Sequence, residues 1–251
     1  MELKQNNLGA VVLAAGKGTR MKSDIAKVLH KVNGQTMLSC VLDAASDLVG
    51  KRIVVVVGHQ SESVKKEVLK TFEVGFAHQK ALLGTGDAVK CALPGLSPDV
   101  GDVLILCGDV PLIRTKTLSD LAWYHKKNQF DITVVAVNME NPEGYGRIIQ
   151  DTDNLLAGIK EDADACSAEK KITLVNAGIY CVKKDFLEKG LALIKTDNAQ
   201  KEYYFTDIVA IAKQLGKRAV CFIVQDPAEV FGVNTVEELK RAEQLLIKMD
   251  L

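Results

Sequence analysis

LGAVVLAAGKGTRMKSDIAKVL, residues 8–29, joins an apolar segment to one rich in glycine and cations. The apolar segment, 9–15, is typical of a strand buried on both faces of a parallel sheet. Gly16 and Gly18 then permit positive φ and let a ligand approach the main chain. Four cations accompany them: Lys17, Arg20, Lys22 and Lys27. The stretch predicts a strand that ends in a loop for a small anion, with backbone amides and side-chain charges as donors.

Two common phosphate-binding fingerprints do not match this loop. The dinucleotide fingerprint needs a third glycine three residues after Gly18, where the chain has Met21. The P-loop needs a glycine, four residues and then Gly-Lys-Ser/Thr, and the loop lacks that spacing. A plain glycine-rich turn with solvated lysines remains the alternative to a phosphate site.

The composition is that of a globular protein without a general affinity for polyanions. The chain has 251 residues, of which 47% are hydrophobic and 25% charged, and its formal net charge is zero. This balance argues against electrostatic binding to nucleic acid or a membrane surface. Residues 1–7 are mostly polar, and no apolar run reaches the roughly 20 residues of a membrane span. We expect a cytoplasmic protein whose six scattered cysteines are mostly buried free thiols.

Strands and helices are predicted to alternate in the first half of the chain. Apolar runs predict strands at 53–57, 74–78, 103–107 and 132–137, and helical periodicity with its stop signals predicts helices at 36–49, 61–71, 84–94 and 115–128. This alternation indicates an α/β fold with a mostly parallel, Rossmann-like sheet flanked by helices. Ligands in such sheets bind beyond the carboxyl ends of the strands. Chemistry is therefore expected in loops 14–20, 79–86 and 107–111.

The pattern changes after residue 140. Hairpin-type strands are predicted at 144–149 and 155–160, a strand at 173–182, helices at 184–195 and 206–215, and a last strand at 219–224. Thr235 and Glu238 form a capping-box pattern for a closing helix that ends near Met249. The chain lacks a Pro/Ser-rich linker, so we expect a single domain over 1–251 with a mixed sheet and a small second lobe.

Asp109 and Asn234 are the candidate metal ligands. Asp109 directly follows a predicted buried strand, where a carboxylate suits a hard cation. A turn-capping role before Pro111 explains it equally well, and Asn234 is equally explained as the residue before a helix N-cap. Nothing in the spacing brings 109 near 234.

LAAGKGTRM, followed by Lys27, resembles the signature of the sugar-nucleotide pyrophosphorylases. Five further motifs occur in the order seen in the uridyltransferase half of the bacterial bifunctional N-acetylglucosamine-1-phosphate uridyltransferases: GDVPL, GYGRI, VNAGI, EYYFTDI and GVNT. The resemblance spans residues 8 to about 240. It implies a nucleotide-diphospho-sugar transferase fold and Mg²⁺-dependent synthesis of UDP-N-acetylglucosamine, a cell-wall precursor, with release of pyrophosphate. The substrates would be UTP and N-acetylglucosamine 1-phosphate, and the acetyltransferase activity is not expected.

The resemblance also implies roles for individual residues. Residues 1–140 would form the nucleotide half, 141–234 the sugar half and 235–251 the closing helix. The nucleotide would be held by Leu13, Ala14, Ala15, Gly16, Gly18, Gln79, Gly84, Thr85 and Gly108. Arg20, Lys27 and Asp109 would be catalytic, and Asp109 with Asn234 would hold Mg²⁺. Gly146, Glu161, Asn176, Tyr203 and Thr206 would line the amino-sugar pocket, although helix entry and core packing also explain Tyr203 and Thr206.

Three departures from that family stand out. Ala26 replaces the proline that usually precedes the lysine, which is expected to loosen the loop. Glu161 is followed by Asp162-Ala163-Asp164-Ala165, without the usual lysine, and Ala177 replaces a threonine. The family's trimer is made largely by the missing half, so a monomer or weak oligomer is expected.

Three rival readings stay open at the sequence level. A sister nucleotidyltransferase would take another base or sugar, with Gln79 and Asn176 as the discriminating residues. A glycosyltransferase of similar fold would use an Asp-x-Asp motif, which 162–164 and 151–153 both match. A non-catalytic nucleotide-sugar sensor would not need Arg20, Lys27, Asp109 and Asn234 together.

Overall fold

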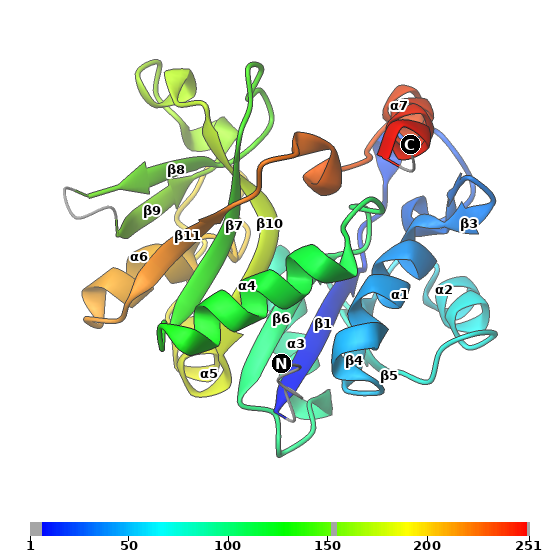
Figure 1. The fold of residues 1–251 in the computed structure, drawn as a ribbon, viewed down its shortest axis with the longest axis horizontal. Helices are drawn as coiled ribbons and strands as arrows, with labels where there is room; N and C mark the ends of the chain where they lie inside the picture. Colours follow the sequence, from blue (N-terminus) through cyan, green and yellow to red (C-terminus); the bar gives the residue numbers. More distant parts are fainter. Residues whose placement is uncertain (1–6, 152–154, 250–251) are drawn as a thin grey trace.

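The computed structural model describes residues 7–151 and 155–249. Its centre is a nine-stranded sheet with the order β11-β7-β10-β6-β1-β4-β5 and a β8–β9 hairpin attached to β10 (Figure 1). β1 (Leu8–Ala14) lies between β4 (Ile53–Val57) and β6 (Asp102–Cys107) and is parallel to both. β5 (Gly75–His78) continues this parallel part beside β4. The predicted glycine-rich loop therefore leaves the sheet from a central strand.

An antiparallel strand joins the two parts of the sheet. β10 (Leu174–Lys183) pairs with β6 on one side and with β7 (Ile132–Asn138) on the other, antiparallel to both. β11 (Ala219–Ile223) is parallel to β7 at the sheet edge. The hairpin consists of β8 (Arg147–Gln150) and β9 (Leu156–Lys160). The predicted mixed, mostly parallel sheet is confirmed.

Helices cover both faces of this sheet. One face carries α1 (Met37–Val49), α2 (Ser61–Val68) and α4 (Thr115–Lys127). The opposite face carries α3 (Thr85–Ala92), α5 (Lys184–Leu191) and α6 (Asp207–Gln214). Successive strand residues point to opposite faces. Leu104 therefore packs in the first layer, that of α1, α2 and α4, and Ile105 packs in the second layer, that of α3, α5 and α6.

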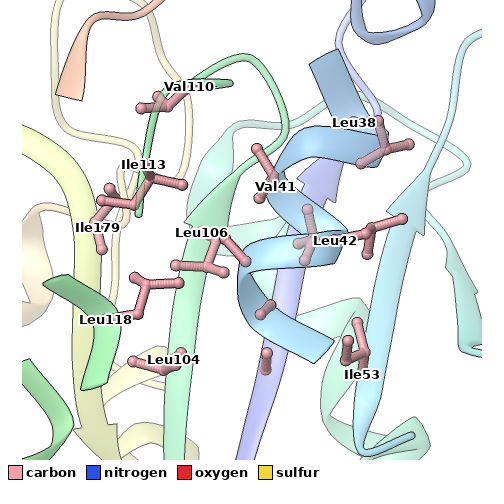
Figure 2. Close-up of a cluster of buried hydrophobic side chains, with 14 of the residues drawn as sticks. Leu38, Val41, Leu42, Ile53, Leu104, Leu106, Val110, Ile113, Leu118 and Ile179 are labelled. Carbon is pink, nitrogen blue, oxygen red and sulfur yellow. The ribbon is translucent and has the colours of Figure 1, made fainter. Parts of the chain in front are cut away.

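Close-packed aliphatic side chains fill the first layer (Figure 2). Leu38 and Leu42 of α1, Leu104 and Leu106 of β6 and Leu118 of α4 are at most 1% exposed. Truncation of such a leucine to alanine costs about 2–5 kcal/mol because it removes apolar contacts and leaves a cavity. These contacts hold the carboxyl ends of β1 and β6, which carry the predicted site loops, in fixed positions.

Several local features differ from the expectation. α2 and α5 end at Val68 and Leu191, earlier than the predicted 71 and 195. Of the six cysteines only Cys181 is buried, while Cys166 is exposed and the others are intermediate, so the expected burial is wrong for most of them. Within 7–151 and 155–249, no helix combines the length and apolar character that a membrane crossing needs. Short elements that the sequence did not predict are β2 (Lys31–Val32), β3 (Gln35–Thr36), and 3-10 turns at Thr19–Met21, Lys27–Leu29, Leu93–Gly95, Asp162–Asp164, Glu169–Lys171 and Pro227–Val230.

The closing helix α7 (Val236–Met249) begins with the predicted capping box. The Glu238 amide donates to Thr235 Oγ1 at 3.1 Å, and the Thr235 amide donates to Glu238 Oε2 at 3.0 Å. Ala242 of the helix packs with Met37 and Leu112 in a small third cluster. The cap fixes the chain direction immediately after Asn234.

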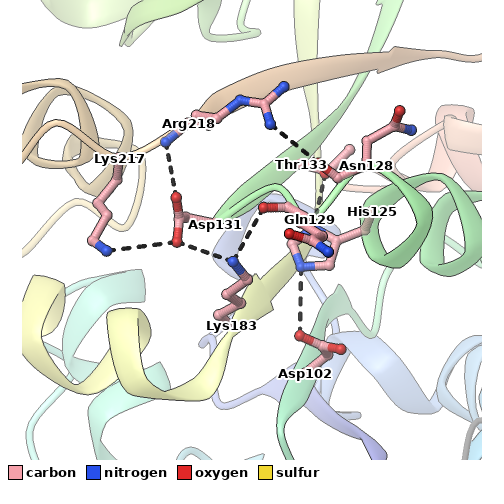
Figure 3. A network of polar contacts seen from close by, with 9 residues as sticks. All are labelled: Asp102, His125, Asn128, Gln129, Asp131, Thr133, Lys183, Lys217 and Arg218. Atoms are coloured by element: carbon pink, nitrogen blue, oxygen red, sulfur yellow. Dashed lines mark hydrogen bonds and ion pairs between the residues drawn. The ribbon is translucent and has the colours of Figure 1, made fainter.

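A polar network lies at the edge of the sheet opposite the predicted loops (Figure 3). Asp131 accepts from the Arg218 amide at 3.0 Å and from Lys183 Nζ at 3.3 Å. His125 Nδ1 lies 2.9 Å from Thr133 Oγ1, and both residues are buried. These contacts tie β7 to its neighbours, and they place the buried histidine far from the carboxyl edge.

Candidate functional site

A cavity of about 540 Å³ opens at the carboxyl ends of β1 and β6. It is lined by parts of all three loops that the sequence singled out and by Asn234 from the start of the last helix. Twelve of the predicted residues contribute to it: Leu13, Ala14, Ala15, Gly16, Gly18, Arg20, Lys27, Gln79, Gly84, Thr85, Asp109 and Asn234. Apart from Gly108, the predicted nucleotide and phosphate residues thus share one cavity, whereas the predicted sugar residues lie outside its lining.

The glycine-rich loop is shaped by the close approach of Lys27. Gly18 has φ +61°, and a Cβ on it would lie 2.5 Å from Lys27 Cβ. Any other residue at 18 would displace the lysine, so this glycine is needed by the protein itself. Gly16 has no atom within 4 Å of where its Cβ would be. Space beside Gly16 is therefore free for a ligand.

Four polar side chains from distant segments converge on one point of the cavity. Lys27 Nζ forms an ion pair with Asp109 Oδ2 and donates to Asn234 Oδ1 at 3.0 Å. Arg20 Nη2 donates to the same Asn234 oxygen at 2.9 Å. A backbone hydrogen bond brings the segments that carry Asp109 and Asn234 together, because the Val233 amide donates to the Asp109 carbonyl at 2.9 Å. The Asn234 side chain therefore faces the cavity instead of capping α7.

This arrangement fits a small hard cation. Asp109 and Asn234 present a carboxylate and an amide oxygen to the same ammonium group. Mg²⁺ takes such oxygen ligands and usually completes its shell with water and substrate phosphates. Nowhere in the described chain do three or more His, Cys, Asp or Glu side chains converge as a metal cage. A metal at this point would depend on ligand phosphates.

The segment before Lys27 is fixed by Gln60. The Ala26 amide donates to Gln60 Oε1 at 3.0 Å, and Gln60 Nε2 donates to the Asp24 carbonyl at 2.8 Å. A proline at 26 would lack that amide hydrogen. The alanine that was expected to loosen the loop thus gains a hydrogen bond instead.

Gln79 is 4% exposed and is the first residue of the loop after β5. Its Nε2 donates to the Gly84 carbonyl at 3.0 Å and to Asp87 Oδ2 at 2.8 Å. Gly84 itself is close-packed, since its Cβ would lie 2.6 Å from the Tyr203 carbonyl oxygen. A free glutamine amide can offer a ligand both a donor and an acceptor, but both donor hydrogens of Gln79 have protein partners.

A segment from the second half of the chain is hydrogen-bonded to loop 79–86. The Gly86 amide donates to the Tyr203 carbonyl at 2.7 Å, and the Tyr203 amide donates to the Leu83 carbonyl at 2.8 Å. The Phe205 amide adds a bond to Thr85 Oγ1 at 3.0 Å. Tyr203 is 37% exposed and lines a separate cavity of about 270 Å³.

The other predicted sugar residues gather around the β8–β10 junction. Thr206 Oγ1 donates to Glu161 Oε1 at 2.8 Å, and a Cβ on Gly146 would lie 3.5 Å from Glu161 Oε2. The backbone amide of Asn176 donates to the Gly146 carbonyl at 2.8 Å. The side chain of Asn176 supports a bulge in its own strand, because Oδ1 accepts from the Gly178 amide and Nδ2 donates to the Tyr180 hydroxyl.

Acidic neighbours and burial act together on Glu161. Burial raises the pKa of Glu161, and the charges of Asp207, Asp164 and Asp162 raise it further, against the hydrogen bond from Thr206. Asp162 forms an ion pair at 2.9 Å with Arg147, whose side chain is 2% exposed. Asp162 is thus occupied by a buried partner rather than presented to a metal. In the other Asp-x-Asp match, Thr152 and Asp153 lie outside the described residues.

Six lining residues were not predicted from the sequence, namely Thr19, Val28, Leu82, Ala88, Cys107 and Glu202, and one predicted nucleotide residue, Gly108, does not line the cavity. Glu202 and Cys107 both contribute to the wall. Burial and the charge of Asp109 raise the pKa of the Cys107 thiol to about 12, so it stays protonated at neutral pH. Gly108 is buried, and its amide donates to the Leu13 carbonyl at 2.9 Å. Two signals were available: Cys107 precedes Gly108-Asp109, and Glu202 is the first residue of the EYYFTDI motif.

Comparison with known proteins identifies relatives along nearly the whole chain. Residues 10–244 match the model of the MobA-like NTP transferase domain. Curated relatives named "Bifunctional protein GlmU" are 50% identical in Geotalea uraniireducens, 46% in Geobacter sulfurreducens and 41% in Desulfotalea psychrophila. The matches cover 96%, 94% and 97% of this chain and 53%, 50% and 71% of those relatives. The chain spans about half the length of most of these relatives.

A solved structure confirms the fold independently of close sequence similarity. The inositol-1-phosphate CTP transferase from T. maritima superimposes with a TM-score of 0.72 at 17% sequence identity, covering 97% of this chain and 96% of that one. The predicted nucleotidyltransferase type of α/β fold is therefore confirmed. Together with the family match, it shows that the chain belongs to the MobA-like NTP transferase domain family and is homologous to one part of the bifunctional GlmU proteins.

Proposed function

We propose that this chain is a Mg²⁺-dependent uridylyltransferase that makes UDP-N-acetylglucosamine and pyrophosphate from UTP and N-acetylglucosamine 1-phosphate. The observation that carries the proposal is the convergence of Arg20, Lys27, Asp109 and Asn234 at one end of a cavity that also contains Gln79. Identity of 41–50% to the GlmU relatives supports it. Residues 1–251 would act as one domain, with a nucleotide half over 1–140, a sugar half over 141–234 and a closing helix.

The reaction would be an in-line transfer of a uridylyl group. A phosphate oxygen of the sugar 1-phosphate forms a bond to the α-phosphorus of UTP, while the bond from that phosphorus to the bridging oxygen breaks and pyrophosphate leaves. The attacking oxygen is already ionised at neutral pH, so no general base is required. Catalysis rests on positioning and on stabilisation of charge.

Side chains and backbone amides of the cavity would supply both the positioning and the stabilisation of charge. Lys27 would contact the sugar phosphate and the α-phosphate, and Arg20 with the amides of the glycine-rich loop would hold the departing pyrophosphate. Asp109 and Asn234 would hold Mg²⁺, which when bound neutralises phosphate charge and polarises the phosphorus–oxygen bonds. Lys27 must leave its present partners to reach a phosphate, so substrate binding would rearrange this group of side chains.

The amino-sugar pocket would form around Glu161, Asn176 and Thr206, beside Gly146. The Glu161 carboxylate suits sugar hydroxyls. Gly146 packs closely beside it, since a Cβ there would lie 2.9 Å from Ile159 Cγ2. Asn176 would have to release a bond to the bulge before it contacts a ligand. Tyr203 would contribute through its backbone, which holds loop 79–86, as much as through its ring.

Release of pyrophosphate from UTP tests the proposal. The chain is incubated with Mg²⁺ and UTP plus N-acetylglucosamine 1-phosphate, glucose 1-phosphate or N-acetylgalactosamine 1-phosphate. We expect release to be strongest with the first sugar and to be abolished by EDTA. Preference for glucose 1-phosphate would refute the amino-sugar assignment and preserve the mechanism. Absence of release with every sugar and with each of the four common NTPs would refute the transferase proposal.

A further inference from the structure

We propose that Asp87 is a positioning residue that sets base selectivity by fixing which end of the Gln79 amide faces the nucleotide. The inference rests on the proposed function, because it assumes that the cavity binds the base of an NTP. Asp87 lies in the first turn of α3, and its Oδ2 accepts from Gln79 Nε2 at 2.8 Å. Neither the family resemblance nor the loop pattern marked this residue.

The orientation of the Gln79 amide is determined by its partners. Nε2 has two hydrogens, and the two groups within reach, Asp87 Oδ2 and the Gly84 carbonyl, are both acceptors. Turning the amide by 180° would place Gln79 Oε1 against two oxygens and lose both hydrogen bonds. The 4% exposure of Gln79 makes that loss expensive, because few water molecules could replace the bonds.

The surroundings restrict these groups as well. Gly84 cannot move away, since it packs against the Tyr203 backbone and has φ +112°. Asp87 is anchored in a helix whose Val89 and Ala92 are fully buried. The Gln79 amide is therefore preorganised with its donors turned inward and with Oε1 as the group left for a ligand.

An acceptor at this point selects for a hydrogen-bond donor on the base. Uracil presents its N3–H between two carbonyl groups, whereas cytosine, of the same size and shape, presents a lone pair at N3. Cytosine in the same pose would set that lone pair against Gln79 Oε1. Bringing its amino group to Oε1 instead would shift the base relative to the phosphate-binding loop. Asp87 thereby acts on the choice between UTP and CTP through Gln79.

Nucleotide binding in the absence of a sugar phosphate tests this role. Calorimetric titration with Mg·UTP and Mg·CTP gives a UTP/CTP affinity ratio for the wild-type protein and for Asp87→Ala. We expect the wild-type protein to prefer UTP. We expect the ratio to fall about tenfold in Asp87→Ala, because one of the two bonds that hold the amide is gone and Nε2 becomes free to face the base.

Controls separate positioning from general damage. Asp87→Asn should restore most of the ratio, because its side-chain oxygen still accepts from Nε2 while the Gly84 carbonyl disfavours the turned amide. Lys90→Ala, one turn farther along α3, should leave the ratio unchanged. If Asp87→Ala does not fold, as judged by thermal melting, Asp87→Ser serves in its place because its hydroxyl is too short to make the same bond.

The outcomes are distinguishable. A ratio that stays at the wild-type value in Asp87→Ala or Asp87→Ser, with both affinities lowered equally, would overturn the positioning role and leave the proposed function intact. Preference of the wild-type protein for CTP would overturn the reading of the base by Gln79 Oε1. A wild-type protein that binds neither nucleotide would refute the proposed function and this inference together.

Discussion

Lys27 forms an ion pair with Asp109 and a hydrogen bond with Asn234, residues that lie 82 and 207 positions farther along the chain. Its ammonium group neutralises the half-buried Asp109 carboxylate, whose side chain is 22% exposed. The same two oxygens are the proposed metal ligands. A lysine and a divalent cation cannot occupy this point at once, so under the proposed function the two would exchange during substrate binding.

Removal of Lys27 should therefore strengthen metal binding to the free protein. We expect Lys27→Ala to bind Mn²⁺, a hard cation of similar ligand preference, about tenfold more tightly than wild type, which corresponds to about 1.4 kcal/mol. Asp109→Asn should lose binding. Electron paramagnetic resonance titration without nucleotide measures both. Equal affinity of Lys27→Ala and the wild-type protein would show that the ammonium does not compete for the site.

Although Lys27→Ala is expected to bind metal more tightly, its turnover should fall. Lys27→Ala removes the cation proposed to stabilise charge on the transferred phosphate, so we expect kcat to fall by about tenfold or more. Lys31→Ala, an exposed position four residues later, is the control and should keep wild-type activity. The rate of pyrophosphate release is the measurement. Wild-type rates in Lys27→Ala would contradict the catalytic assignment.

Gly16 and Gly18 should respond differently to alanine. At Gly18 the added Cβ would meet Lys27 Cβ at 2.5 Å in a left-handed backbone conformation, so Gly18→Ala should lower both the melting temperature and activity. At Gly16 the Cβ meets no protein atom within 4 Å. Gly16→Ala should melt like the wild-type protein but raise KM for UTP, because the methyl group occupies space next to the backbone where a nucleotide would lie. An unchanged KM in Gly16→Ala would place the nucleotide elsewhere.

The sequence predicted the parts of this site that are local. Gly16, Gly18 and Lys27 belong to one continuous motif, and Asp109 follows directly from a buried strand, so spacing alone placed them at the carboxyl edge of the sheet. Asn234 could be linked to Asp109 only by resemblance, because their pairing depends on the Val233 amide reaching the Asp109 carbonyl.

Contacts between distant loops could not be predicted in the same way. Hydrogen bonds from Gln60 to 24–26 and from the Tyr203 backbone to loop 79–86 join segments without a shared sequence pattern. The internal bonds of Gln79 and Asn176 were equally hidden. Residue type showed what each amide could bind, while the folded chain decides which of its atoms remain for a ligand.

Gln60 should stabilise the Lys27 segment through Ala26. Gln60→Ala removes the acceptor of the Ala26 amide, and we expect a loss of about 1 kcal/mol in the free energy of unfolding. Ala26 has φ −52°, which proline also adopts, so Ala26→Pro keeps the backbone shape but removes the donor. In that background Gln60→Ala should cost less. A double-mutant cycle by urea unfolding measures the coupling, and additive effects would show that the bond contributes nothing.

Glu161 should make stability depend on pH. Burial, reinforced by Asp207, Asp164 and Asp162, raises the pKa of this carboxyl above its usual value of 4.5, so the folded state binds its proton more tightly than the unfolded state. Its contribution to stability is complete below the unfolded pKa and is lost as pH rises through the folded pKa. Glu161→Gln, which keeps an acceptor for Thr206 without the charge, should raise the melting temperature at about pH 7 more than at about pH 4.

The matched control lies in the same segment. The Cys166 amide donates to Glu169 at 2.7 Å, and this hydrogen bond lowers the pKa of the Glu169 carboxyl. Its contribution is therefore present above the unfolded pKa, and Glu169→Gln should give no gain at about pH 7. Melting curves of both variants at the two pH values decide the matter. An equal shift of Glu161→Gln at both pH values would mean that folding leaves the ionisation of Glu161 unchanged, against the effect of burial and of the acidic residues around it.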